Sequence, residues 1–209
     1  CLFQTILKNI LKMNNKVETH QIKVHIGLGN LGVGKTCLAI RYRSKTFPKD
    51  YIPRCYDDYT IISEFEDESI SLSLWDYCGD EKYVGLVNRE RMLRLSLATM
   101  DFVCFIFSVV DRKSFEDVKS VHLASLEEHC PNAIRLLVGT KSDLRNDVKT
   151  IEKLQNDNIN MVSKSEAQSM VKTIKAIGYV ETSSLTGDGV EEVFETAIRA
   201  VLQRIRKSK

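Results

Sequence analysis

The sequence is sparing with the features that define several common protein classes. Its six cysteines, at positions 1, 37, 55, 78, 104 and 130, include no C-x-x-C pair, which argues against zinc and against a disulfide framework and favours the reducing cytosol. The formal net charge is only +2, so the chain as a whole offers no electrostatic case for nucleic acid. No apolar run approaches the length that a membrane-spanning helix requires. With 43% hydrophobic residues, the 209 residues are expected to form one cytoplasmic domain with a full core.

A glycine-rich stretch at residues 29–36 carries the first functional motif. It reads Gly-Asn-Leu-Gly-Val-Gly-Lys-Thr and fits G-x-x-x-x-G-K-[ST], a loop whose backbone N–H groups cradle phosphates. In that pattern Lys35 reaches the β- and γ-phosphates, and Thr36 offers its hydroxyl to Mg²⁺. Residues 22–26 alternate like a strand and residues 37–42 continue as a helix, which favours this interpretation over a chance glycine-rich turn. The residues expected to contact the phosphates are Gly29, Leu31, Gly32, Val33, Gly34, Lys35, Thr36 and Cys37.

Hydrophobic patterning beyond this loop predicts alternating strands and helices. Residues 59–66 and 69–76 are typical of an antiparallel hairpin, whereas the apolar runs 102–109 and 134–138 are typical of buried parallel strands. Helices are expected at residues 36–47, 114–130 with Ser114 as N-cap, 163–177 and from 189 onward, and a short strand at 178–181. The sequence therefore predicts an α/β fold: a mostly parallel six-stranded sheet with one antiparallel hairpin strand and helices on both faces. Asp76, at the end of a hairpin strand, is a second candidate ligand for Mg²⁺.

Two polar segments in the second half of the chain indicate a site for a base. Residues 140–143 read Thr-Lys-Ser-Asp after an apolar strand, and residues 181–185 read Glu-Thr-Ser-Ser-Leu. They resemble the two base-contacting loops of Ras-type GTPases. The carboxylate of Asp143 can accept from both the N1–H and the 2-amino group of guanine, which adenine cannot supply, so the wrong base leaves buried acceptors unpaired. Asp143 therefore indicates a guanine site, with Lys141 along the base and ribose.

Further motifs resemble those of the Rho/Rac family of small GTPases over roughly residues 20–205. Phe-Pro-x-x-Tyr-Ile-Pro at 47–53, Leu-Trp-Asp at 74–76 and Val-Gly-Thr-Lys-x-Asp-Leu-Arg at 138–145 match that family, and residues 148–158 resemble its extra helix. The resemblance implies a Ras-like P-loop NTPase fold and a switch that alternates between GTP and GDP with Mg²⁺. It also implies recruitment of effectors, typically for the control of actin and cell shape.

The same resemblance implies roles for individual residues. Phe47 would pack on the guanine and Tyr51 would cover the phosphates. Residues 48–58 and 78–97 would be the two switches, which meet effectors, exchange factors, GTPase-activating proteins and dissociation inhibitors. The base site would comprise Thr140, Lys141, Asp143, Leu144, Ser183, Ser184 and Leu185. The catalytic candidates are Lys35, Gly79, which keeps a backbone N–H for the γ-phosphate, and Asp80.

The departures from the family pattern all affect positions that serve GTP hydrolysis. Leu31 stands where the family usually has Gly, Arg54 replaces its Mg²⁺-binding Thr, and Asp80 replaces its water-orienting Gln. Water orientation and the arginine finger are the large terms in this chemistry, the finger alone being worth about 10³ to 10⁵ in rate. A slow, largely GTP-bound switch is therefore expected. The alternatives are an ordinary cycling GTPase, a scaffold that barely binds nucleotide, and an ATP-using kinase, in which Asp143 would have no base partner.

Both ends of the chain carry basic segments outside the expected domain. Residues 1–19 hold apolar residues at helical spacing, and they are expected to be an upstream or disordered extension because Met13 is a plausible start; an amphipathic targeting helix is the alternative. Residues 206–209 form a basic tail that resembles the segment before a prenylated cysteine, which implies weak contact with the plasma membrane surface. Residues 84–98 predict an amphipathic helix in a second switch longer than the family pattern.

Overall fold

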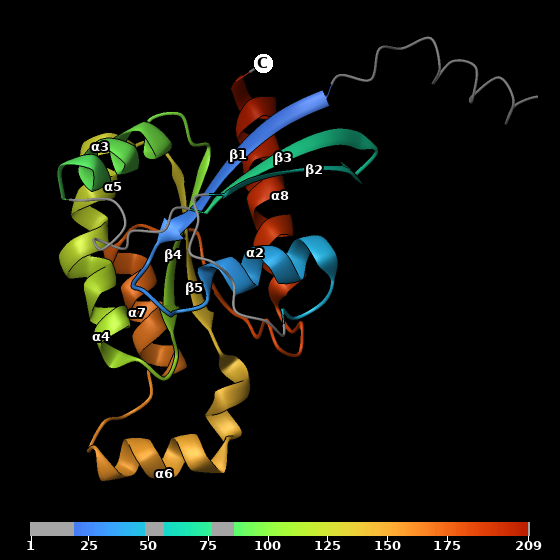
Figure 1. Ribbon diagram of the computed structural model, residues 1–209. Helices are drawn as coiled ribbons and strands as arrows, with labels where there is room; N and C mark the ends of the chain where they lie inside the picture. The colour runs from blue at the N-terminus through green and yellow to red at the C-terminus, as the bar shows by residue number, and fades with distance from the viewer. Residues whose placement is uncertain (1–18, 49–56, 77–85, 209) are drawn as a thin grey trace, which may run out of the picture.

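The computed structural model describes residues 19–48, 57–76 and 86–208 of the chain. One sheet of six strands comprises β1 (Thr19–Leu28), β2 (Asp57–Phe65), β3 (Glu68–Asp76), β4 (Phe102–Ser108), β5 (Ile134–Thr140) and β6 (Tyr179–Glu181), in the order β2-β3-β1-β4-β5-β6 (Figure 1). Among the strands of the described residues, β2 and β3 pair antiparallel and all other neighbours pair parallel. The predicted mostly parallel sheet with one antiparallel hairpin is confirmed.

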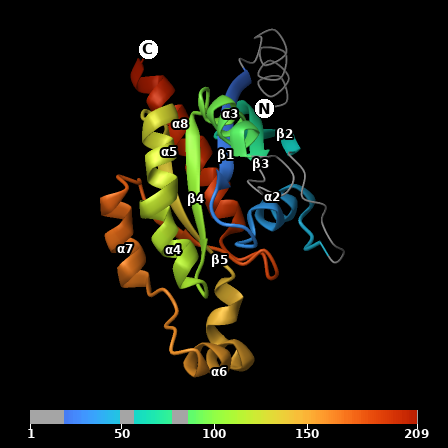
Figure 2. The same ribbon diagram turned by 60° about the vertical axis from the view of Figure 1, so that its left-hand side comes forward.

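Helices cover both faces of this sheet (Figure 1, Figure 2). One face carries α2 (Lys35–Ser44) and α8 (Val190–Ser208). The other carries α3 (Leu86–Leu97), α4 (Arg112–Asp117), the π-helical turn η1 (Val118–His122), α5 (Leu123–His129) and α7 (Lys164–Thr173). A 3₁₀ turn, η2 (Ser142–Asn146), leads into α6 (Val148–Asn156), which buries none of its residues and projects from the body of the domain (Figure 2).

Two apolar clusters, one on each face of the sheet, form the core. Strand β4 contributes to both, because every one of its residues is buried. Phe102 and Ile106 belong to the cluster shared with α2 and α8, whereas Phe105 and Phe107 belong to the cluster shared with α4, α5 and α7. The continuous apolar run in the sequence is therefore explained by alternation between two covered faces.

The helix expected to start at Ser114 begins earlier, which corrects the prediction. Its N-cap is Asp111, whose carboxylate accepts the backbone N–H of Ser114 at 3.2 Å. The Ser114 hydroxyl does not cap the helix, because it accepts the backbone N–H of Ser108 in β4 at 3.0 Å. Asp and Ser are comparably good N-caps, and this tertiary contact decides between them.

Three further boundaries differ from expectation. Helix α2 stops at Ser44 instead of residue 47, because Lys45 adopts the left-handed conformation with φ 59° and donates its N–H to the Arg41 carbonyl. Helix α7 ends at Thr173, short of residue 177. Residues 206–208, expected as a separate tail, continue helix α8.

Candidate functional site

The loop at residues 29–34 joins the carboxyl end of β1 to the start of α2 (Figure 1). A Cβ on Gly29 would lie 2.2 Å from the carbonyl oxygen of Ile106 in β4, so only glycine fits there. Gly34, the N-cap of α2, has φ 104°, a conformation that side chains rarely adopt. No described side chain caps this helix end. The N–H groups of its first turn are therefore available to an anion.

Lys35 supplies positive charge inside this loop. Its side chain is buried, and Nζ donates to the carbonyl oxygens of Gly29 and Asn30, each at 2.8 Å. These bonds wrap the loop around the ammonium group. Val33 is buried at the base of the loop, whereas Leu31 is 53% exposed at its surface. The loop thus combines a cation with the N–H groups of a helix start, which is the chemistry of a phosphate site.

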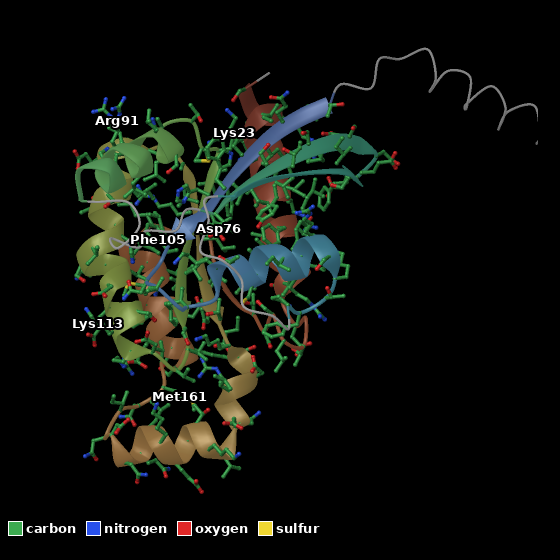
Figure 3. All side chains as sticks on the ribbon, in the orientation of Figure 1. Lys23, Asp76, Arg91, Phe105, Lys113 and Met161 are labelled. Carbon is green, nitrogen blue, oxygen red and sulfur yellow. The ribbon has the colours of Figure 1, made fainter. Side chains whose placement is uncertain are left out.

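The Thr36 hydroxyl and the Asp76 carboxylate place two oxygen atoms together beside this loop; Asp76 is labelled in Figure 3. The Thr36 hydroxyl donates to Oδ2 of Asp76 at 2.5 Å, and Asp76 is 2% exposed at the end of β3. Mg²⁺ prefers such hard oxygen ligands and usually takes one or two from the protein, with water and phosphate oxygens completing its shell. Within residues 19–48, 57–76 and 86–208, no group of three or more His, Cys, Asp or Glu could hold a metal. Because it offers two hard oxygen atoms beside a loop with the chemistry of a phosphate site, the pair fits Mg²⁺ held jointly with phosphates.

The two segments expected to contact a base meet in the structure. Ser183, which is fully buried, donates its hydroxyl hydrogen bond to Oδ1 of Asp143 at 2.5 Å. The backbone N–H of Ser142 donates to the carbonyl of Thr182 at 3.1 Å. Lys141, directly after β5, has φ 61°, a left-handed conformation that turns the chain sharply. The loops after β5 and β6 thus form one unit.

Thr140 connects this unit to the phosphate loop. Its hydroxyl lies 2.5 Å from the carbonyl oxygen of Val33 and 2.9 Å from that of Phe107, and the residue is 2% exposed. The phosphate loop and the base loops, more than one hundred residues apart, are therefore linked directly at the carboxyl ends of parallel strands. Ligands of open α/β sheets bind at this edge.

A part-buried ion pair supports the base loops from behind. Arg145 donates from Nε and Nη2 to the two carboxylate oxygens of Glu181, at 2.8 and 2.7 Å, and Tyr179 donates its hydroxyl to Glu181 at 2.8 Å. Burial, the largest single effect, would raise the pKa of Glu181, but the hydrogen bonds from Arg145 and Tyr179 and the positive charges of Arg145 and Lys164 together outweigh it and hold that pKa below its usual value. Sequence reasoning missed this pair, although Arg145 ends a motif and Glu181 begins another.

A second contact missed from the sequence holds the outer side of the phosphate loop. Asn30 donates from Nδ2 to Oδ2 of Asp117 at 2.6 Å, and its Oδ1 lies 2.9 Å from Nε2 of His122 in the π-helical turn. The hydrogen bond from Asn30 is the main cause of a lowered pKa at Asp117. No sequence pattern predicts a π-helical turn, so the contact of Asn30 with Asp117 and His122 could not be predicted from the neighbouring residues.

Of the remaining residues predicted for the nucleotide site, six lie in the described part of the chain and four lie outside it. Phe47 is 36% exposed just after α2, and Leu185 is 55% exposed. Burial raises the pKa of the Cys37 thiol, with the nearby Lys141 acting in the opposite direction. Ser184 is buried, and Leu144 and Gly32 lie on the two loops with partial or full exposure. Tyr51, Arg54, Gly79 and Asp80 lie outside the described residues, so their roles stay predictions.

A glycine-rich loop at a helix start, a hydroxyl–carboxylate pair beside it and two linked loops after β5 and β6, all on this α/β sheet, form the arrangement of a P-loop NTPase fold. The sequence also matches the family model described as Ras, the Ras family, over residues 23–203. Because this match covers most of the chain, the protein belongs to the Ras family. It is a small GTPase, and such GTPases bind guanine nucleotides, generally with Mg²⁺, and interact with regulators and effectors. In the part of the chain that the structure describes, no helix is long and apolar enough to cross a bilayer.

Proposed function

We propose that the protein is a Rho-type GTPase switch that hydrolyses GTP slowly and is largely GTP-bound. The observation that carries this proposal is the position of Leu31, whose side chain stands 53% exposed on the phosphate loop instead of packing into the core. By the family resemblance, a side chain here crowds the attacking water and any arginine finger. Because the finger is worth about 10³ to 10⁵ in rate, its exclusion leaves little turnover.

The roles of the site residues follow from the motifs and the family resemblance, and the contacts between these residues support them. Lys35 binds the β- and γ-phosphates, and Thr36 with Asp76 holds Mg²⁺, which neutralises phosphate charge when bound. Asp143 accepts from the guanine base, and Lys141 lies along its face. The support for this assignment is that Ser183 already orients the Asp143 carboxylate at 2.5 Å.

The Rho-type assignment has one structural support besides the motifs. Residues resembling the extra helix of that family form α6, which starts with Asp147 as N-cap and leaves Val148 65% exposed. Effectors and regulators would bind through residues 48–58 and 78–97, and the output would be control of actin and cell shape. Of the basic residues near the end, Arg206 is engaged with Glu68 at 2.8 Å, so only a weak membrane contact is proposed.

Single-turnover hydrolysis tests the role of Leu31. We expect purified wild-type protein loaded with GTP to release phosphate slowly, and the Leu31→Gly variant, alone or with Asp80→Gln, to release it faster, above all with a GTPase-activating protein. Ile177→Gly is the matched control, because Ile177 is equally exposed, at 54%, and lies away from the phosphate loop. Equal rates in the wild type and both loop variants would overturn the proposed role of Leu31.

A further inference from the structure

His25 is a buried polar residue that the nucleotide site does not use. It lies in β1 shortly before the phosphate loop and is fully buried. Its Nδ1 accepts the backbone N–H of Gly27 at 3.1 Å, and its Nε2 lies 3.1 Å from the Ser96 hydroxyl. Because a backbone N–H can only donate, Nδ1 carries no proton, so Nε2–H is the donor to Ser96.

The hydrogen-bond chain continues into helix α3. Ser96 is 2% exposed in the last turn of α3, and its hydroxyl donates to the Leu93 carbonyl at 2.8 Å. Each proton in the series from Gly27 through His25 and Ser96 to Leu93 therefore has one acceptor. Burial lowers the pKa of His25 to about 3, and Lys35 acts in the same direction, so the ring stays neutral and keeps its acceptor nitrogen.

The ring also sits at an irregularity of β1. His25 pairs with Val103 of β4, but Leu28 pairs with Phe105, so β1 carries one residue more than β4 over this interval. Such a bulge bends a strand and redirects the next segment of the chain, which here is the loop beginning at Gly29. The His25 ring accepts the N–H of Gly27 inside the bulge, and so fixes the shape of the strand that enters the phosphate loop.

The opposite side of α3 faces outward. Arg91 is exposed and points away from the domain (Figure 3), whereas Leu97 is fully buried and Leu93 packs against the core. The helix is therefore anchored along the side that carries Ser96, and His25 is the side chain of β1 that reaches it by a hydrogen bond.

We propose that His25 is a positioning residue that couples the phosphate loop to helix α3, the helix of the second switch. The bulge and the helix are held by the two nitrogens of one ring, so a displacement of the loop is transmitted to α3. We call the two hydrogen bonds of the His25 ring, to Gly27 and to Ser96, the clamp between β1 and α3. The effect of nucleotide on the coupling rests on the proposed function, whereas the clamp itself does not.

Two variants open the clamp from its two ends. His25→Asn keeps an acceptor near the position of Nδ1 but is too short to reach Ser96, and Ser96→Ala removes the other partner with little risk to folding. Ser169→Ala is the matched control, because the Ser169 hydroxyl bonds to the Ser165 carbonyl of its own helix α7 at 3.0 Å. Amide hydrogen exchange of residues 86–97 and the ratio of affinities for GDP and a non-hydrolysable GTP analogue are measured for each variant and for the double variant.

We expect His25→Asn and Ser96→Ala each to accelerate exchange in α3 by about five- to tenfold, as the loss of one buried hydrogen bond implies. The ratio of the affinities for GDP and the GTP analogue should shift by the same factor in His25→Asn and in Ser96→Ala. The double variant should show no larger change than either single variant, and Ser169→Ala should change neither the exchange rate nor the affinity ratio. Unchanged or additive exchange in α3 would overturn the clamp. Faster exchange with an unchanged affinity ratio would overturn the coupling to nucleotide. If no variant and no wild-type protein binds guanine nucleotide, the proposed function fails with the coupling, while the exchange data still decide the clamp.

Discussion

The Ser183 hydroxyl donates a hydrogen bond to the Asp143 carboxylate across 2.5 Å, and thereby joins two loops that are forty residues apart in the sequence. Ser183 is fully buried, so the protein fixes the direction of this carboxylate before any base arrives. A preorganised acceptor lowers the cost of ordering on binding. The selectivity for guanine is therefore expected to depend on this pair.

The Asp143→Asn variant should bind GDP about 10- to 100-fold more weakly, because the amide replaces one acceptor by a donor that opposes the guanine N–H groups. Titration with fluorescent GDP measures the change. Asp188→Asn is the control, since Asp188 is an exposed carboxylate near the same loop that accepts from Thr186 at 2.7 Å. Equal GDP affinity in wild type and Asp143→Asn would show that the base does not contact this carboxylate.

Removal of Mg²⁺ with EDTA should accelerate nucleotide release from the wild type. The Thr36→Val variant should release nucleotide fast already without EDTA, so that EDTA accelerates its release little. The Thr36 hydroxyl, 2.5 Å from Asp76, is a proposed ligand, and its loss leaves Mg²⁺ weakly held from the start. Nucleotide release with and without EDTA is followed by fluorescence. Thr46→Val, just beyond the far end of α2, should keep the full response. A full EDTA response in Thr36→Val would argue against Thr36 as a ligand.

The Arg145→Ala variant should lower the free energy of unfolding by about 2 kcal/mol, because it leaves the Glu181 carboxylate without its guanidinium partner. This is less than the cost at a fully buried pair, since the two side chains are 22% and 14% exposed. Urea denaturation measures the loss. Arg206→Ala, which breaks a pair whose side chains are 49% and 29% exposed, should leave the midpoint nearly unchanged. Equal losses in both variants would remove the special role of Arg145.

Acid should destabilise the wild type more steeply than His25→Asn. The pKa of His25 is lowered to about 3 in the folded protein, so below the ordinary histidine pKa of about 6.5 the unfolded chain binds a proton that the folded chain does not. The contribution of this pKa difference to the free energy of unfolding is fully present above pH 6.5. It is lost as the pH falls toward 3, by about 1.4 kcal/mol per pH unit. Denaturation midpoints between pH 6.5 and 4 provide the comparison, and parallel pH profiles would contradict it.

Signals between near neighbours in the sequence led to much of the fold and part of the site. The glycine pattern at 29–36 predicted the phosphate loop, and the acidic turn after Phe65 marked the hairpin, where Glu66 and Asp67 adopt φ 50° and 64°. The continuous apolar runs marked strands covered on both faces. Such patterns are informative because helix and strand periods repeat within a few residues.

Contacts between distant residues could not be predicted in this way. The Asn30–Asp117 hydrogen bond joins residues 87 positions apart, and the His25–Ser96 contact joins residues 71 apart. His25 follows Gln21 and Lys23 on the polar side of the alternating strand, so the sequence pattern gives no sign that its side chain is buried, and nothing local identifies its partner. Where Asp111 and Ser114 could both cap a helix, only the packing of Ser114 under β4 decided.

The most direct test of slow hydrolysis is the fate of bound nucleotide. Purified wild-type protein is loaded with GTP, kept with Mg²⁺ at room temperature for several hours, and the nucleotide is released and identified by chromatography at intervals. The expected result is that GTP persists in the wild type while Leu31→Gly combined with Asp80→Gln converts it to GDP. Conversion of the wild-type GTP to GDP as fast as in that double variant would contradict the slow, largely GTP-bound switch.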